Sequence, residues 1–532
     1  MNTFIDAATF FGDHRPLGIP SDTGEPDFVT LVNRTRNLDA SPYPYSILKA
    51  ILDRENRRLG AGPKTIDSIA SINGQTIFIV CGQQAGLFGG PLYTLYKAMH
   101  AVQLSLRLSE LTGRNVLPLF WVASDDHDFE EVKKIGVKTR DGEKSTIEYH
   151  PDRQVEGVPV GEIMLDEGII SAVDSLAETL PTGEASGRYL DILRSAWKPG
   201  SRWSDAFTAQ MLRLFASYGL VLFDPRWKGV KNLFRSIFIA ELSDPLASAA
   251  LVNKEADAFE SVGMRKKALR KSVGSTNLFL TVDGVRLPLF VEKEGFRAGN
   301  QSLTKSDMFN IVNSSPDRVS PAASLRPICQ DTIMPVAALI CGPGERIYME
   351  QVKPLYTLFG VSRSLVWPRA SFTVIDSRII RNAEKERIPL PMMFANSERI
   401  RKDLALDSFP RETGKALDSL DALIESGFTR AAESIALIDP TLKDSVKKDM
   451  GKVLHIARSI RERALRAHRS SLAISEKRLL SASYFLLPDG KPQERWFGAD
   501  LIFTSLDDDG FDEFIKATSP HEEYHRIVLP QK

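Results

Sequence analysis

The stretch from residue 76 to residue 132 constrains the fold most, because its pattern is strand, helix, strand. Residues 77–80 and 116–123 are short apolar runs rich in β-branched side chains, as expected for strands of a parallel sheet covered by helices on both faces. Pro91 between them suits the first turn of a helix, and one helical stripe carries Leu92, Leu95, Met99, Val102 and Leu106. The stretch therefore predicts a βαβ unit with a right-handed crossover.

Polar residues follow both strands at the edge where parallel sheets bind ligands. The first strand leads into Gly82-Gln83-Gln84-Ala85-Gly86, and the second leads into Ser124-Asp125-Asp126-His127-Asp128. Because the carboxyl ends of parallel strands share one edge of the sheet, these two segments should lie close together. We expect the functional site there.

Composition narrows the class of protein. The chain has 532 residues, too many for one simple core, and its 68 basic residues balance its 68 acidic residues. That balance gives no sign of a nucleic-acid or membrane surface. Cys81, Cys329 and Cys341 are too far apart for a paired zinc motif or a disulfide framework, which fits a reducing cytoplasm. With no membrane-length apolar run and no signal peptide, we expect a cytoplasmic protein.

Further strand patterns extend the βαβ unit into an α/β domain. Short apolar runs near residues 219–225, 336–341 and 365–369 predict a five-stranded, Rossmann-like parallel sheet interrupted by two connective inserts. The expected boundaries are core at 1–135, 201–232 and 321–376, inserts at 136–200 and 233–320, an α-helical coiled-coil arm at 377–482, and a segment packing back on the core at 483–532.

The arm is predicted from a heptad pattern. From Thr441 to about Arg478, apolar residues recur at spacings of four and three: Val446, Met450, Val453, Ala457, Ile460, Ala464, Ala467, Ser471 and Ile474. A similar stripe from Leu417 to Ile435 predicts a second helix folded back antiparallel to the first. Packing of the two helices on their own core is one alternative. Sustained heptads favour a coiled-coil arm that joins two copies of the chain as a homodimer.

The glycine-rich segment after the first strand is a candidate ligand loop. It matches neither the dinucleotide G-x-G-x-x-G motif nor a P-loop. A tight strand-to-helix turn explains its glycines but not its two adjacent glutamines, so we assign substrate or nucleotide binding to this loop. The assigned residues are Gly82, Gln83, Gln84 and Gly86, with Tyr93 and Lys97 on the helix that follows.

The acidic segment after the second strand is the candidate catalytic site. A histidine between carboxylates is suited to carry a proton near neutral pH, which assigns catalysis to His127, Asp126 and Asp128 and binding to Ser124 and Asp125. A helix cap formed by Ser124 or Asp125 is one alternative. Metal binding by Asp126-x-Asp128, typical of metal-dependent sugar transfer, is another, although we assign no metal.

A later group of polar residues could complete the site. Gly342-Pro343-Gly344-Glu345 repeats the strand, glycine turn and helix pattern seen after Cys81, and Tyr348 follows one turn later. Arg326 suits a carboxylate or phosphate because its guanidinium is a two-pronged donor. The binding residues assigned here are Arg326, Gln330, Gly342, Gly344, Glu345 and Tyr348.

These motifs resemble one known family. Gly82-Gln83-Gln84-Ala85-Gly86-Leu87, Asp126-His127-Asp128-Phe129-Glu130-Glu131, Gly342-Pro343-Gly344-Glu345 and Gln493-Glu494-Arg495 are similar, in order, to blocks of the cysteine-adding enzymes of bacillithiol biosynthesis. Cys81, Gly89 and Asp125 depart from that pattern. The resemblance implies a Rossmann-like core with two connective inserts and a dimeric coiled-coil arm. It also implies a ligase that forms an amide between L-cysteine and the amino group of glucosaminyl-malate, giving the thiol bacillithiol.

On this interpretation each group has an expected role. His127 is the general base on the amine, Asp126 and Asp128 orient it and bind ammonium groups, Gln83, Gln84 and Gly86 bind acyl or phosphate oxygens, and Arg326 meets the malate carboxylates. The resemblance allows ATP or ADP binding, although the His-x-Gly-His signature of class I aminoacyl-tRNA synthetases is missing from the sequence. The alternatives are a metal-dependent sugar transferase using a nucleotide sugar, and a non-catalytic dimeric scaffold.

Overall fold

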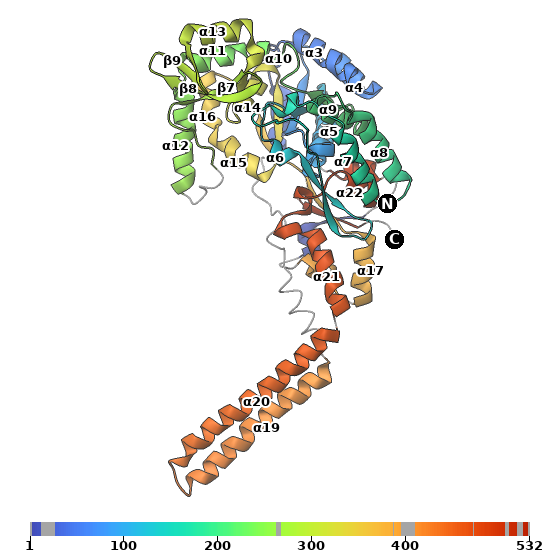
Figure 1. Cartoon of the computed structure of the whole chain (residues 1–532), viewed down its shortest axis with the longest axis vertical. Helices are drawn as coiled ribbons and strands as arrows, with labels where there is room; N and C mark the ends of the chain where they lie inside the picture. The colour runs from blue at the N-terminus through green and yellow to red at the C-terminus, as the bar shows by residue number, and fades with distance from the viewer. Residues whose placement is uncertain are drawn as a thin grey trace. The chain divides into compact units, whose positions relative to one another are not determined.

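The chain forms two compact units. The computed structural model describes residues 3–11, 27–261, 268–386, 388–394, 410–471, 473–505, 510–518 and 525–529. Unit 1 comprises Met1–Ile375 with Lys491–Lys532, and unit 2 comprises Asp376–Gly490. Figure 1 shows both units, with mixed helices and strands in unit 1 and helices in unit 2.

A five-stranded parallel sheet forms the centre of unit 1. Its strand order is β13-β12-β2-β3-β6, with every neighbouring pair parallel, which confirms the predicted Rossmann-like α/β core. The strands are β2 (Ile77–Gln83), β3 (Val116–Val122), β6 (Val221–Phe223), β12 (Val336–Cys341) and β13 (Leu365–Pro368). β3, β6 and β12 are buried along their whole length, as their apolar sequences require.

The helices of the core carry apolar faces toward these strands. They are α2 (Phe28–Asn37), α3 (Tyr45–Arg58), α4 (Pro63–Ala70), α5 (Tyr93–Thr112), α9 (Trp203–Leu214), α14 (Arg326–Ile333), α15 (Pro343–Gln351) and α16 (Lys353–Phe359). In α5, the expected buried stripe is wrong at Leu106, whose side chain is 52% exposed. The buried side of α5 instead includes Leu104 and Leu108. Each lies two positions from Leu106, and residues two positions apart lie on nearly opposite sides of a helix.

Two inserts interrupt the core. The first contains the antiparallel pair β4 (Lys134–Lys138) and β5 (Lys144–Glu148) with helices α7 (Gly168–Thr179) and α8 (Glu184–Ala196). The second contains an antiparallel sheet of order β10-β9-β8-β7-β11 with helices α11 (Arg235–Ser243), α12 (Ala247–Ser261) and α13 (Lys305–Ser314). Its strands are β7 (Ser275–Val282), β8 (Val285–Glu292), β9 (Gly295–Ala298), β10 (Gln301–Thr304) and β11 (Val319–Pro321).

A third sheet brings distant parts of the chain together. β15 (His525–Leu529) lies between β1 (Thr3–Asp6), to which it is antiparallel, and β14 (Ser371–Val374), to which it is parallel. Beside this sheet, Arg369 and Glu494 form a doubly hydrogen-bonded ion pair in which both side chains are buried. The Ser371 hydroxyl donates to the same carboxylate at 2.8 Å. These contacts fix the segment around Glu494 to the core.

Unit 2 contains the predicted helical hairpin. α19 (Arg411–Ala436) and α20 (Leu442–Ser471) lie side by side and antiparallel (Figure 1), and the unit also includes α17 (Ser377–Glu386) and α21 (Ala473–Leu486). Ala432 and Ala457 are buried between the long helices, and Arg461 pairs with Asp418 and Asp421 at 2.8 and 2.9 Å. The sequence predicts one helix to about Arg478. Residue 472 lies outside the described residues, and α20 and α21 are separate elements on either side of it.

The buried ion pair of unit 1 predicts a large effect on stability. Glu494→Gln should lower the free energy of unfolding by about 3–5 kcal/mol, because it leaves the Arg369 guanidinium buried without a counter-charge. Urea denaturation measures this change. Glu110→Gln is the control, since Glu110 pairs with Arg107 on the exposed surface of α5 and should change stability by no more than about 1 kcal/mol. Equal losses in the two variants would contradict the prediction.

Candidate functional site

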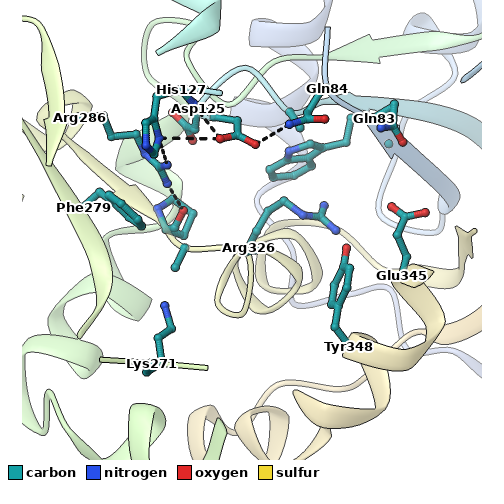
Figure 2. Close-up of a pocket in the computed structure, with 17 residues that line it drawn as sticks. Gln83, Gln84, Asp125, His127, Lys271, Phe279, Arg286, Arg326, Glu345 and Tyr348 are labelled. Atoms are coloured by element: carbon teal, nitrogen blue, oxygen red, sulfur yellow. Dashed lines mark hydrogen bonds and ion pairs between the residues drawn. The ribbon is translucent and has the colours of Figure 1, made fainter. Parts of the chain in front are cut away.

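A pocket of about 510 Å³ lies at the carboxyl edge of the central sheet in unit 1. One wall comes from the segments that follow β2 and β3, and the opposite wall comes from the second insert and α14 (Figure 2). Its size is in the range of small-molecule sites, which span about 300–1,000 Å³. The lining residues are Gly82, Gln83, Gln84, Trp121, Ala123, Asp125, Asp126, His127, Lys271, Phe279, Arg286, Pro321, Ala322, Ala323, Arg326, Glu345 and Tyr348.

The glycine-rich loop is held rigidly in an unusual backbone conformation. Phe88, Gly89 and Gly90 all have positive φ, with Phe88 at 52°, a conformation that costs energy for a residue with a side chain. The Phe88 carbonyl accepts hydrogen bonds from Gln210 Nε2 at 2.8 Å and from the Tyr189 hydroxyl at 3.2 Å. These buried contacts fix the loop. Gln83 and Gln84, which precede it, are therefore held at the pocket wall.

Gln83 is anchored by a buried lysine. Lys97 on α5 is 1% exposed, and its ammonium donates to the Gly82 carbonyl at 2.7 Å and to Gln83 Oε1 at 2.9 Å. Lys97 also pairs with Glu345 at 2.5 Å. The Glu345 carboxylate also accepts a hydrogen bond from the Gly342 N–H at the start of its own helix, α15. Lys97 thus neutralises the Glu345 carboxylate of the pocket, but Lys97 itself is buried outside the pocket lining and cannot contact a ligand.

A second buried lysine has the same effect on Asp125. The Asp125 carboxylate forms ion pairs with the ammonium of Lys231, which is 1% exposed, and with the Arg226 guanidinium at 3.2 Å. Burial alone would raise the pKa of Asp125. The two cations outweigh this effect and lower the pKa, so the carboxylate is charged and its negative charge is balanced by Lys231 and Arg226. Ser124 donates a hydrogen bond to Asp224, and burial raises the pKa of Asp224 to about 6.

Asp126, His127 and Asp128 have three different environments. Asp126 accepts hydrogen bonds from Gln84 Nε2 at 2.7 Å and from the His127 backbone N–H at 2.7 Å. His127 Nδ1 lies 3.8 Å from Asp126 Oδ1 but only 3.2 Å from Nη1 of Arg286. Asp128 is the N-cap of the short helix α6 (Phe129–Val132) and accepts the Glu131 N–H at 3.3 Å. Of these three residues, Asp126 and His127 line the pocket.

The second insert supplies a basic wall. Arg286 on β8 stacks on the Phe279 ring of β7, with 3.6 Å between the guanidinium carbon and the ring centroid. Lys271 precedes β7, where Asn253 holds its backbone by hydrogen bonds of 2.8 and 3.0 Å. Burial lowers the pKa of Lys271 to about 8, and Arg286 acts in the same direction. Figure 2 shows both side chains directed toward the pocket.

Arg326 at the start of α14 adds a third cation. Its guanidinium donates to Gln330 Oε1 at 3.0 Å and lies 5.6 Å from the Trp121 ring. Burial raises the pKa of Tyr348 beyond its ordinary range, so this phenol stays protonated beside Arg326. In the part of the chain that the structure describes, none of Lys271, Arg286 and Arg326 forms an ion pair with a carboxylate.

The pocket is therefore electrically polarised. The carboxylates of Asp125 and Glu345 are compensated by Arg226, Lys231 and Lys97, whereas Asp126 is hydrogen-bonded only to uncharged groups. Within the described residues, the three cations of the opposite wall form no ion pair, although Asp125 and Asp126 act electrostatically on Arg286, and Glu241 acts on Lys271. A ligand with more than one negative group and one positive group would match both walls.

Comparison with known proteins identifies the family. Residues 26–370 match the N-terminal Rossmann-like domain of bacillithiol biosynthesis BshC, and residues 372–529 match its C-terminal coiled-coil domain. The chain belongs to the BshC family. Three relatives share the name "Putative cysteine ligase BshC". The protein from Salinibacter ruber is 29% identical over 92% of this chain and 89% of its own length. Those from Chlorobaculum tepidum and Thermus thermophilus are both 31% identical, over 84% and 78% of this chain and 82% and 81% of their own lengths.

The structure brings together many of the residues singled out in this BshC-family sequence. Gly82, Gln83, Gln84, Asp125, Asp126, His127, Arg326, Glu345 and Tyr348 line one pocket. The others are not among its lining residues: Gly86, Tyr93, Lys97, Ser124, Asp128, Gln330, Gly342 and Gly344. Several of these support the lining from behind. Gly86 packs so closely on Gly90 that a β-carbon would lie 2.6 Å from the Gly90 α-carbon, and Tyr93 lies 3.5 Å from Gln83.

The sequence analysis did not single out the charged and aromatic residues that the second insert and the segment after β6 add to the site, namely Arg226, Lys231, Lys271, Phe279 and Arg286. Arg286 carries a recognisable signal, because it is the basic residue within the otherwise apolar run of β8. Lys271 has no such signal, since it follows a segment with several other lysines and arginines. Its place in the pocket depends on how the second insert folds against the core.

Other features limit the chemistry of the described residues. Cys81, Cys329 and Cys341 are buried, and burial raises the pKa of each thiol, so none is poised as a nucleophile. Among the residues with a described position, His, Cys, Asp and Glu form no group of three suited to a metal ion. No helix within the described ranges has both the length and the apolar character of a membrane span.

The Lys271 environment predicts unusual amine reactivity. Acetylation by short pulses of acetic anhydride should reach half its maximum at about pH 8, because burial lowers the pKa and the neutral amine fraction rises above that value. Peptide mass spectrometry across pH 6–10 measures the profile, with exposed Lys228 as the reference site. A midpoint for Lys271 near the ordinary lysine value of about 10.4 would contradict this account.

Proposed function

We propose that this chain is a ligase that joins L-cysteine to the amino group of glucosaminyl-malate through an amide bond, giving bacillithiol. Membership of the BshC family supports the pathway, and the name shared by its relatives supports a cysteine ligase. The acceptor and the type of bond are our proposal, and they rest on the pocket.

The proposal rests on the distribution of charge in the pocket. The Asp125 and Glu345 carboxylates are paired with cations, whereas, among the described residues, Lys271 and Arg326 are in no ion pair. Glucosaminyl-malate bears two carboxylates and one amine, so it needs an excess of cations at one end and a carboxylate at the other. Arg326 and Lys271 can receive the carboxylates, and Asp126 can receive the amine as an ammonium group. Arg286 already donates to three protein groups and contributes mainly its charge.

The reaction itself makes two further demands. The bound ammonium group must first give a proton to the Asp126 carboxylate, so that the nitrogen has a lone pair. The amine nitrogen then attacks the carbonyl carbon of an activated cysteine, such as a mixed anhydride with phosphate. The bond from that carbon to the leaving oxygen breaks, and the departing phosphate takes the second amine proton. Negative charge then develops on the carbonyl oxygen, which needs nearby hydrogen-bond donors. His127 lies at the wall where such an oxygen would be placed. The neighbouring Gln84 amide already donates to Asp126 at 2.7 Å and to Glu131 at 3.2 Å, so the imidazole is the side-chain donor of this wall. ATP is the phosphate donor that we propose to test.

The proposed function predicts a specific product. Purified protein supplied with cysteine, glucosaminyl-malate and ATP should form bacillithiol, measured by mass spectrometry of the thiol. Omitting each reactant in turn is the control. Product formation without ATP would show another source of activation. Two results would contradict the ligase proposal. One is Mn²⁺-dependent transfer of sugar from a nucleotide sugar. The other is the absence of turnover in a protein that binds only a macromolecular partner.

Two cations of the pocket are expected to bind the carboxylates of the acceptor. Arg326→Met and Lys271→Met should each raise the KM for glucosaminyl-malate by about tenfold or more at pH 7, because each removes a charge-assisted contact. For the dimethyl ester of glucosaminyl-malate, whose carboxyl groups carry no charge, the KM values of the variants and of the unaltered protein should differ little. Arg297→Met is the control, since Arg297 is a cation of the second insert that lies outside the pocket. Equal losses for acid and ester would refute the assignment.

We also propose that two copies associate through α19 and α20. The hairpin leaves large apolar side chains exposed on these helices and their connection: Leu420, Leu423, Leu437, Ile438, Leu442, Ile456 and Ile460. A second copy presents the same exposed apolar side chains and can bury them, since large apolar side chains exposed on charged helices favour association with another helix. The coiled-coil domain of the family supports this proposal.

The proposed dimer predicts a change of oligomeric state without loss of folding. Ile456→Arg with Ile460→Arg should yield a monomer by sedimentation, because both side chains are exposed in the single chain and their loss removes contacts only between copies. The helical circular dichroism of the variant should be retained. Leu106→Arg, at an exposed position of α5, is the control and should remain dimeric. A monomeric parent protein would defeat this proposal.

A further inference from the structure

His127 differs from a catalytic base in the polarity of its neighbours. In a typical aspartate–histidine pair, the carboxylate accepts the Nδ1 proton, which leaves Nε2 free to take a proton from the substrate. In this chain the group nearest to Nδ1 is a guanidinium. Nη1 of Arg286 lies 3.2 Å from Nδ1, whereas Asp126 Oδ1 lies 3.8 Å from it (Figure 2).

The contact with Arg286 determines which ring nitrogen carries the proton. A guanidinium has five N–H donors and no acceptor, so Arg286 can only donate to Nδ1. Nδ1 must therefore present its lone pair, and the neutral ring carries its proton on Nε2. In the other tautomer, an N–H of the ring would face an N–H of Arg286 and the hydrogen bond would be lost.

Arg286 is fixed independently of His127. Its Nε donates to Ser320 Oγ at 2.9 Å, and its Nη2 donates to the Pro321 carbonyl at 3.0 Å. The guanidinium also stacks on Phe279, and the residue is 7% exposed. These contacts all come from the second insert, so the insert presents a preformed donor to the histidine of the core.

Asp126 is not hydrogen-bonded to the His127 ring, since its Oδ1 lies 3.8 Å from Nδ1. Its Oδ1 accepts the backbone N–H of His127 at 2.7 Å, and its Oδ2 accepts Gln84 Nε2 at 2.7 Å. The carboxylate therefore orients the histidine through its backbone and binds the glutamine of the neighbouring strand. It does not hold the imidazole in the tautomer that a general base requires.

We infer that His127 acts through its Nε2–H as a hydrogen-bond donor to a substrate oxygen that gains negative charge, and that Arg286 is the positioning residue that fixes this tautomer. The inference rests on the proposed ligase function for the identity of that oxygen, the carbonyl oxygen of the activated cysteine. This role replaces the general-base role expected from the sequence.

The tautomer can be measured without any enzymatic turnover. In full-length protein labelled with ¹⁵N on its eight histidines, two-bond proton–nitrogen spectra distinguish the two neutral tautomers. The signal lost in His127→Gln identifies His127, and it should report a proton on Nε2. Arg286→Lys, which keeps a cationic donor, should preserve this pattern, and Arg286→Met should abolish the single tautomer. A proton on Nδ1 in the unaltered protein overturns the inference.

Turnover tests the catalytic half of the inference. Glutamine can place an amide N–H near the position of Nε2 but cannot take up a proton, so His127→Gln should keep activity within about tenfold of the unaltered protein. His127→Ala, which removes the donor, should lose about 100-fold or more in kcat. His150→Gln is the matched control, because His150 is an exposed histidine of the first insert, outside the pocket. Equal losses for glutamine and alanine would assign His127 to proton transfer and overturn the inference.

The two proposals fail in different ways. If no preparation forms bacillithiol from cysteine and glucosaminyl-malate, the proposed function fails, while the nuclear magnetic resonance spectra still decide the tautomer. If bacillithiol forms but His127 carries its proton on Nδ1, the ligase proposal stands and the role assigned to His127 and Arg286 fails.

Discussion

The charge of the pocket depends on two lysines that no ligand can reach. Lys97 and Lys231 are each 1% exposed, and each holds a carboxylate of the pocket wall, Glu345 and Asp125 respectively. A buried ammonium is stable only when such a partner and further acceptors surround it. Because these lysines neutralise the acids from behind, the wall that they support is far less negative than its sequence indicates. The cations of the second insert are then left to define which ligand can enter.

The second insert is therefore more than a connection between core strands. Its sheet places Lys271, Phe279 and Arg286 across from the ends of β2 and β3, and its last strand supplies the Pro321 carbonyl that holds Arg286. The core contributes the groups that touch the reacting atoms in our proposal, whereas the insert sets their polarity. A change in the insert could thus alter the chemistry of His127 without touching the core.

Much of this arrangement follows from the sequence, and the reason is local periodicity. The apolar runs at Ile77 and Val116 allow only a buried parallel pair, and that pair brings Gln84 and Asp126 within hydrogen-bond distance. Sequence patterns could not separate the two roles of the acidic cluster. Asp126 lines the pocket while Asp128, two residues later, caps a helix. Nor could they place Arg286 and Lys271 in this pocket, because that position depends on contacts between segments more than 100 residues apart.

The ion pair between Arg369 and Glu494 has a consequence for the order of synthesis. The two residues are 125 positions apart, and the hairpin of unit 2 lies between them in the sequence. At about 5–20 residues per second, a ribosome needs roughly 6–25 s to pass from one to the other. During that interval the nascent core holds an arginine with no counter-charge, and the β15 strand that completes the third sheet has not yet been made. A chain released early is left with an open sheet edge and an unpaired cation, features that chaperones and proteases can recognise.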